Sequence, residues 1–189
     1  MIFVIVVALV AVGVLSPYLI IARKRSCMLR RMSAIARRSG FRVRHLHRFV
    51  CFSKNTSRRY DLLFESKTHA YAVKLWSAQK KNATLIIKDG KVCEAVDVCD
   101  AITPDKPRRR VCTRARRVPV TQNNFKLKRV KPITEIMLCY PPYKQITVLS
   151  KSGERTLVSG DKLFDKQICL PIDLENMLGE PKEITVVTE

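Results

Sequence analysis

An apolar run near the start of the chain, from Ile2 to Ala22, constrains the fold more than any other feature of the sequence. As a helix with a rise of about 1.5 Å per residue, it would be about 31 Å long, close to the hydrocarbon thickness of a bilayer. Three consecutive basic residues, Arg23 to Arg25, follow the run directly. Because Lys and Arg beside a membrane helix stay on the cytoplasmic side, the sequence predicts a single-pass anchor over residues 1–22, with the remaining chain in the cytoplasm.

A cleaved signal peptide is the alternative interpretation of this run. Such a segment begins with a positive region, has a shorter apolar core and ends at a small-residue cleavage site. Here only Met1 precedes the apolar run, and the basic cluster follows it. The order of these parts favours an anchor.

Two tracts of the chain carry its net charge of +20. Residues 23–59 contain thirteen Lys and Arg, residues 106–131 contain eleven, and neither tract contains an Asp or Glu. The sequence therefore predicts a near-neutral body with two basic belts. Anionic lipid would attract such a belt by about 1 kcal/mol per cation near the surface, and nucleic acid is the other polyanion that would bind it. The candidate polyanion-binding residues are Arg23, Lys24, Arg25, Arg30, Arg31, Arg108, Arg109, Arg110, Arg114, Arg116 and Arg117.

The chain beyond the anchor is long enough for one domain with its own core. We divide it into a basic amphipathic helix over 23–40, an α/β domain over 41–180 that includes a basic loop over 103–131, and a polar tail over 181–189. Seven cysteines show no zinc-ligand or disulfide spacing, so we expect free thiols and no metal site among them. Cys27 beside the anchor has two interpretations, a palmitoylated thiol or an unmodified one.

The basic helix has its apolar residues at helical spacing between Ser26 and Ser39, with arginines mostly to the sides. One interpretation is a helix that lies on the membrane surface. The other is the first helix of the domain, packed on a sheet. The two are compatible if the arginines still face lipid.

The remaining pattern predicts mostly β structure. Residues Tyr60–Glu65 and Ala70–Trp76 flank a polar turn and indicate a hairpin, and Asp89-Gly90 indicates a second one between residues 83–88 and 91–96. Prolines and arginines between Thr103 and Val120 indicate a surface loop. Further strands are expected at 41–52, 132–140, 146–149, 156–159 and 167–170, and a short helix at 173–178.

The first hairpin carries Asp61 at its start and Lys74 late in its second strand. In this pattern the chain resembles the restriction-endonuclease-like, PD-(D/E)xK fold, including its membrane-anchored nuclease-related relatives. The resemblance implies one early helix packed on a mixed sheet. It also implies that Asp61 matches the metal-binding Asp and Lys74 the Lys of the Glu-x-Lys motif. In that family two carboxylates hold Mg²⁺, which activates water, and the Lys positions the attacking water.

Ala72 stands where the resemblance requires the second carboxylate. We therefore expect a catalytically inactive nuclease-like domain without a cofactor, in which Asp61 and Lys74 are remnants of a site and the basic belts bind lipid headgroups or nucleic acid at the cytoplasmic membrane face. The alternative is a metal-dependent nuclease that uses Asp61 as a metal ligand, Lys74, and a carboxylate from elsewhere: Glu65, Glu94 or Asp97. A third interpretation is a scaffold whose sheet edge recruits a protein partner that the sequence does not identify.

Overall fold

The computed structural model describes residues 2–55, 57–100, 103–111, 114–118, 120–127, 130–150 and 153–179, without the side chains of residues 2–17 and 97–109. Its elements are, in chain order, α1 (Ile2–Arg38), β1 (Arg42–His45), η1 (Val50–Phe52), β2 (Leu62–Glu65), β3 (Ala70–Trp76), β4 (Thr84–Lys88), β5 (Lys91–Asp100), β6 (Thr103–Val111), β7 (Arg116–Arg117), β8 (Ile133–Cys139), β9 (Gln145–Ser150), β10 (Gly153–Leu157), β11 (Lys162–Leu163), β12 (Lys166–Cys169) and α2 (Pro171–Gly179).

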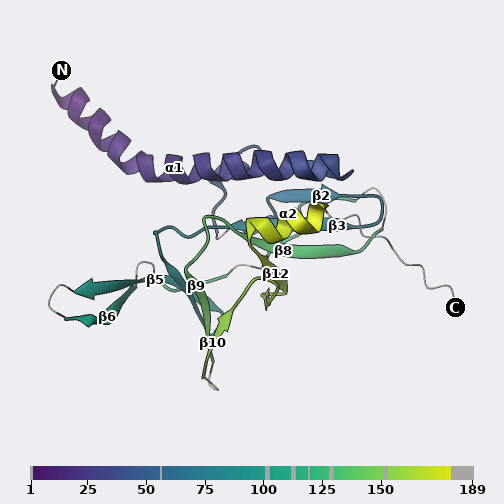
Figure 1. Ribbon diagram of the computed structural model, residues 1–189. Coiled ribbons are helices and arrows are strands. Elements are labelled where there is room, and N and C mark those ends of the chain that lie inside the picture. Colours follow the sequence, from purple (N-terminus) through teal and green to yellow (C-terminus); the bar gives the residue numbers. More distant parts are fainter. Residues whose placement is uncertain are drawn as a thin grey trace.

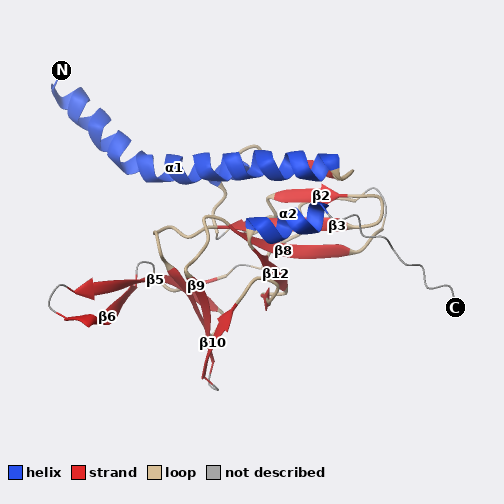
Figure 2. Ribbon diagram, viewed as in Figure 1, coloured by secondary structure: helices blue, strands red, loops and turns tan. Residues whose placement is uncertain are grey.

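The first sheet has the strand order β1-β2-β3-β8-β12-β11 and is mixed. Strand β2 runs antiparallel to both β1 and β3, whereas β8 lies parallel to both β3 and β12. Helices α1 and α2 lie on the same side of this sheet (Figures 1 and 2). The structure thus confirms the coarse prediction of an α/β chain with a helix packed on a mixed sheet.

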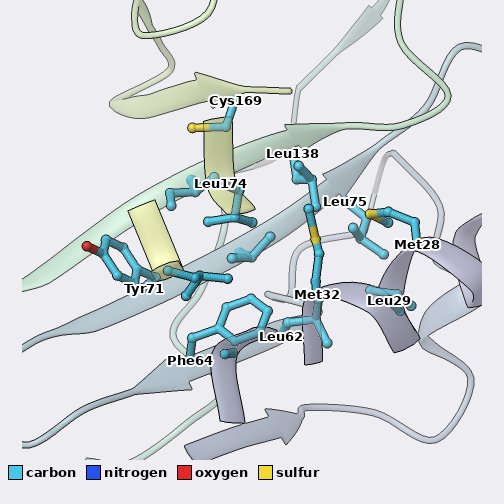
Figure 3. Close-up of a cluster of buried hydrophobic side chains, with 14 of the residues drawn as sticks. Met28, Leu29, Met32, Leu62, Phe64, Tyr71, Leu75, Leu138, Cys169 and Leu174 are labelled. Atoms are coloured by element: carbon cyan, nitrogen blue, oxygen red, sulfur yellow. The ribbon is translucent and has the colours of Figure 1, made fainter. Parts of the chain in front are cut away.

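A hydrophobic core fills the space between the helices and the sheet (Figure 3). Strands β2 and β3 contribute alternate residues because successive side chains of a strand point to opposite faces. Helix α1 contributes a stripe at helical spacing. The buried residues of the three elements are Leu62 and Phe64, then Tyr71, Val73 and Leu75, and then Met28, Leu29, Met32 and Ala36.

The second sheet has the order β10-β9-β4-β5-β6, with β7 paired to β5. Asp89 and Gly90 connect β4 and β5 with positive φ angles of 49° and 69°, the geometry of the tight hairpin turn that the sequence predicted. A second hydrophobic core joins Trp76, Met137 and Ile168 of the first sheet to Leu85 and Ile146 of the second. The helix-free face of the first sheet therefore packs against the second sheet.

The predicted loop over residues 103–131 is wrong in its first part, because Thr103–Val111 form β6 and Arg116–Arg117 form β7. Pro104 and Pro107 suggested a loop because proline cannot donate a backbone hydrogen bond. Strand β6 is the edge of its sheet, and an edge strand needs donors on one side only.

The strand predicted over residues 41–52 is also shorter than expected. Strand β1 ends at His45 because its antiparallel partner β2 begins opposite it, at Leu62. Beyond His45, the Leu46 N–H still donates to the Asp61 carbonyl at 3.0 Å, and the chain then turns through η1 before returning to β2.

The helices predicted over residues 2–22 and 26–39 form one continuous helix, α1, whose first part turns away from the domain (Figure 1). In the part of the chain that the structure describes, no helix is long and apolar enough to cross a membrane. Most of the predicted anchor, residues 2–17, has side chains outside that part, and the tail over 181–189 lies outside it entirely.

Candidate functional site

The structure brings Asp61 and Lys74 together as a buried ion pair. Asp61 lies just before β2 and Lys74 lies in β3, so the antiparallel pairing of these strands places them side by side. Lys74 Nζ is 3.1 Å from Asp61 Oδ2, and the two side chains are only 2% and 0% exposed. The hairpin predicted from the sequence is therefore correct, and it creates this contact.

Four donors surround the carboxylate of Asp61. Oδ1 accepts hydrogen bonds from His47 Nε2 at 2.7 Å and from the hydroxyl of Ser53. Oδ2 accepts from Lys74 Nζ and, at 2.7 Å, from the backbone N–H of Leu75. Because a carboxylate offers about four lone-pair positions, a metal ion would have to displace one of these donors. Asp61 as arranged does not fit a Mg²⁺ site; it fixes residues 47–53 to β3.

The ammonium group of Lys74 is equally occupied. Besides Asp61, Nζ donates to Ser53 Oγ at 3.3 Å and to the backbone carbonyl of Lys54 at 3.2 Å. These three acceptors match its three protons. Burial lowers the pKa of Lys74, and the negative charge of Asp61 opposes that shift. Lys74 thus directs its three ammonium protons to atoms of the chain itself. In a nuclease of the resembling family, the lysine would instead contact the attacking water.

Arg25 of α1 joins the same network and is only 3% exposed. Its Nε donates to Ser77 Oγ at 2.7 Å, and a terminal nitrogen donates to the carbonyls of Cys51 and Ser53. Burial lowers its pKa, with Asp61 acting in the opposite direction. The prediction that Arg25 binds an external polyanion is therefore wrong: its guanidinium clamps α1 to the loop after β1 and to the end of β3.

The alternative carboxylates lie in other places. Glu65, at the far end of β2, pairs with Lys131 at 2.9 Å. Glu94 of β5 accepts from Tyr143 at 2.8 Å and from the backbone of Gln79, and burial raises its pKa. The side chain of Asp97 lies outside the described residues. Among the side chains that are described, no group of three His, Cys, Asp or Glu could hold a metal ion.

Glu135 is the carboxylate that the sequence analysis missed. The parallel pairing of β3 with β8 places it directly beside Ala72, where the resemblance requires a carboxylate. Glu135 lies 3.4 Å from Lys166 Nζ and lines, with Lys74, a cavity of about 690 Å³ on the helix-free face of the first sheet. The only sequence signal was its place in a predicted strand, because local sequence does not encode which distant strand a parallel strand joins.

Exposed Arg and Lys side chains cover the outer face of α1. Six cations there are exposed and lie in two rows whose members are seven residues apart, about 10.5 Å along the helix. One row contains Arg23, Arg30 and Arg37, and the other contains Lys24, Arg31 and Arg38. The structure thus places Arg23, Lys24, Arg30 and Arg31 of the predicted set on one surface, with Arg31 also 2.7 Å from Glu175 of α2.

The second basic belt is on the other sheet. Arg110, Arg114, Arg116 and Arg117 are exposed on or next to β6 and β7, while the side chains of Arg108 and Arg109 lie outside the described residues. Figure 1 shows α1 along one side of the molecule and the β5–β6 hairpin projecting from the second sheet. The two predicted belts are therefore separate surfaces.

A scan against protein-family models, a search of curated proteins and a search of solved structures each found no match to this chain. The resemblance to the restriction-endonuclease-like fold therefore stays a prediction.

Proposed function

We propose that this chain is a membrane-associated, catalytically inactive α/β module of restriction-endonuclease-like type. Its N-terminal helix holds the domain at the cytoplasmic membrane face, and its basic surface binds anionic lipid headgroups. The outer face of α1 carries this proposal: two rows of exposed cations, with no Asp or Glu anywhere between residues 1 and 59.

The position of these cations favours lipid over a soluble polyanion. The rows continue the helix that contains the proposed anchor, so Arg23 and Lys24 lie at the bilayer surface when that anchor is inserted, and the later cations lie farther along the helix. At about 1 kcal/mol per cation within a Debye length of an anionic surface, Arg23 and Lys24 together contribute roughly 2 kcal/mol. Exposed aromatic residues beside α1, Phe49 and Phe52, add apolar side chains of the kind that enter the headgroup region.

The buried ion pair supports the inactive part of the proposal. Every polar atom of Asp61 and Lys74 that catalysis would need has a hydrogen-bond partner within the chain. We expect no cleavage when the full chain is incubated with plasmid DNA, single-stranded DNA or RNA and Mg²⁺ or Mn²⁺. Metal-dependent cleavage that Glu135→Gln abolishes would overturn the inactive assignment in favour of a rearranged nuclease.

Flotation of the full chain with vesicles tests lipid binding. The protein is synthesised in the presence of neutral phosphatidylcholine vesicles or of vesicles with added phosphatidylglycerol, at low and high salt. The anchor should insert into both, whereas the anionic lipid should increase the floated fraction at low salt only, because salt screens exposed charges. Replacing Arg23, Lys24, Arg30 and Arg38 by Gln should remove that increase.

The matched control removes the same charge from another surface. Lys80, Lys81, Lys88 and Lys91 are exposed on or beside the second sheet, so their replacement by Gln should leave the increase intact. Equal loss in both quadruple variants would show that net charge alone is responsible, and no increase with phosphatidylglycerol would reject the lipid proposal. Salt-dependent binding of nucleic acid in the absence of that increase would assign the belts to nucleic acid instead.

A further inference from the structure

A groove of about 460 Å³ lies between α1 and the segment that follows β1. Arg30 and Arg37 of α1 line one wall, and His45 and Arg48 line the other. None of its lining residues is an Asp or Glu, and Ser26 and Ser33 add hydroxyl groups. Three arginines, a histidine and two serines therefore line one small volume.

The fold explains why these cations converge. Arg30 and Arg37 are seven residues apart and so occupy the same flank of α1. Contacts of η1 with α1 and the clamp by Arg25 hold the opposite wall close to the helix. Arg48 on that wall lies over the ring of Phe49, with its guanidinium carbon 5.8 Å from the ring centre. This stacking orients the Arg48 side chain.

The charge of the groove indicates an anionic ligand. Three arginines without a carboxylate repel one another, and a bound anion relieves that repulsion. Burial, followed by the positive charge of Arg37 and the neighbouring His47, lowers the pKa of His45. Guanidinium groups match phosphate oxygens in pairs, and their combined charge suits a dianionic phosphate better than a singly charged diester.

The surroundings of the groove indicate that the phosphate belongs to a membrane lipid. The row that contains Arg30 and Arg37 continues through Arg23 toward the apolar end of α1. Phe49, which is 63% exposed, stands in the chain between Arg48 and Val50, which line the groove. A soluble phosphate would gain nothing from this apolar neighbour.

We propose that the groove between α1 and residues 45–51 binds the phosphate monoester headgroup of a membrane lipid. This inference rests on the proposed lipid-binding function and deepens it, because it adds a site with headgroup preference to a surface that otherwise responds to charge alone.

Cys51 provides a local readout, because its side chain lines the groove and is partly exposed. The full chain in neutral detergent micelles is treated with N-ethylmaleimide, and the modification rate of each thiol is followed by mass spectrometry. Micelles contain phosphatidic acid, a monoester, or phosphatidylglycerol, a diester, at equal surface charge. A third arm uses glycerol 3-phosphate without anionic lipid. Cys93, also partly exposed but on β5, is the internal reference.

We expect phosphatidic acid to slow the modification of Cys51 by about tenfold at ten times its half-protecting concentration, as simple occupancy requires, and to leave Cys93 unchanged. Phosphatidylglycerol should need at least about tenfold more lipid for the same protection, which corresponds to the preference of the paired guanidiniums for a dianion. Arg37→Gln should remove the difference between the two lipids. Arg38→Gln is the matched control, because this neighbouring residue lies in the other row, and it should retain the difference.

Equal protection by both lipids, with equal effects of Arg37→Gln and Arg38→Gln, would overturn the groove proposal and leave the general lipid-binding function standing. Protection by glycerol 3-phosphate as strong as by phosphatidic acid would overturn the lipid source and assign the groove to a soluble phosphate. If flotation shows no dependence on anionic lipid, the proposed function fails independently of either result.

Discussion

Replacing Asp61 and Lys74 one at a time tests whether their ion pair is a structural clasp. Asp61→Asn removes the negative charge and leaves Lys74 buried, with Arg25 as a second cation nearby. Breaking a buried pair in this way costs about 3–5 kcal/mol, because the remaining charge has neither water nor a counterion. Lys74→Met leaves the carboxylate with three hydrogen-bond donors and with the positive charge of Arg25, so we expect a smaller loss of about 1–3 kcal/mol.

The free energy of unfolding can be followed through Trp76, the single tryptophan of the chain, which is buried two residues from Lys74. Urea unfolding of the full chain in neutral detergent micelles should shift its fluorescence to the red as water reaches the ring. The double variant Asp61→Asn with Lys74→Met should cost less than the sum of the single losses by about 1–3 kcal/mol, because the second change removes the stranded cation.

A surface pair supplies the control for this cycle. Arg155 lies 3.6 Å from Asp161 but is largely exposed, so Arg155→Met should change stability by less than about 0.5 kcal/mol. If Lys74→Met costs as much stability as Asp61→Asn, the larger role that the hydrogen bonds give to Asp61 is wrong. If the two losses simply add, the two side chains do not stabilise each other as an ion pair.

Three further results are expected. Burial raises the pKa of Glu94 above its value in the unfolded chain, so the unfolded state loses its proton first and stability falls as pH rises above about 4.5. Glu94→Gln should remove this part of the pH dependence. The measurement is the difference in melting temperature between the two proteins from pH 4 to 8. Met32→Ala should cost about 2–5 kcal/mol in urea unfolding, since Met32 is fully buried between α1 and the first sheet. Burial raises the pKa of the Cys139 thiol to about 12, so a thiol reagent at pH 8 should modify Cys27 rapidly and Cys139 only after unfolding; equal rates would contradict the burial of β8.

Local patterns predicted much of this fold. The turn residues between β2 and β3, and Asp89-Gly90 between β4 and β5, fix hairpins within a few residues of sequence, and both hairpins are present. Pairings between distant strands have no such signal. The parallel neighbours β3 and β8 are separated by the whole second hairpin and β6, so the sequence did not reveal that Glu135 lies beside Ala72.

The sequence identified Asp61 and Lys74 as site residues but did not reveal the hydrogen bonds that surround them. The hairpin explains why Asp61 and Lys74 meet. It does not explain why His47 points at Asp61, because the sequence analysis placed His47 within a strand over residues 41–52. His47 lies in the turn that follows the early end of β1, and this turn brings its ring to the carboxylate. Arg25 was indistinguishable from its neighbours in a basic run, because only tertiary packing decides which cation of such a run becomes buried.

The basic helix packs on the sheet as the first helix of the domain, and helical geometry explains where its cations lie. With 3.6 residues per turn, the residues that contact the sheet fall on one side of α1, and this buried side includes Arg25 as well as Met28, Leu29 and Met32. The remaining arginines and Lys24 are then placed on the opposite side by the same period. The helix is therefore both the first packed helix of the domain and a cationic surface. The hydrogen bonds of Arg25 fix the rotation of α1 about its own axis. That rotation determines which cations face outward, and it places Arg30 and Arg37 on the flank that lines the groove with Arg48.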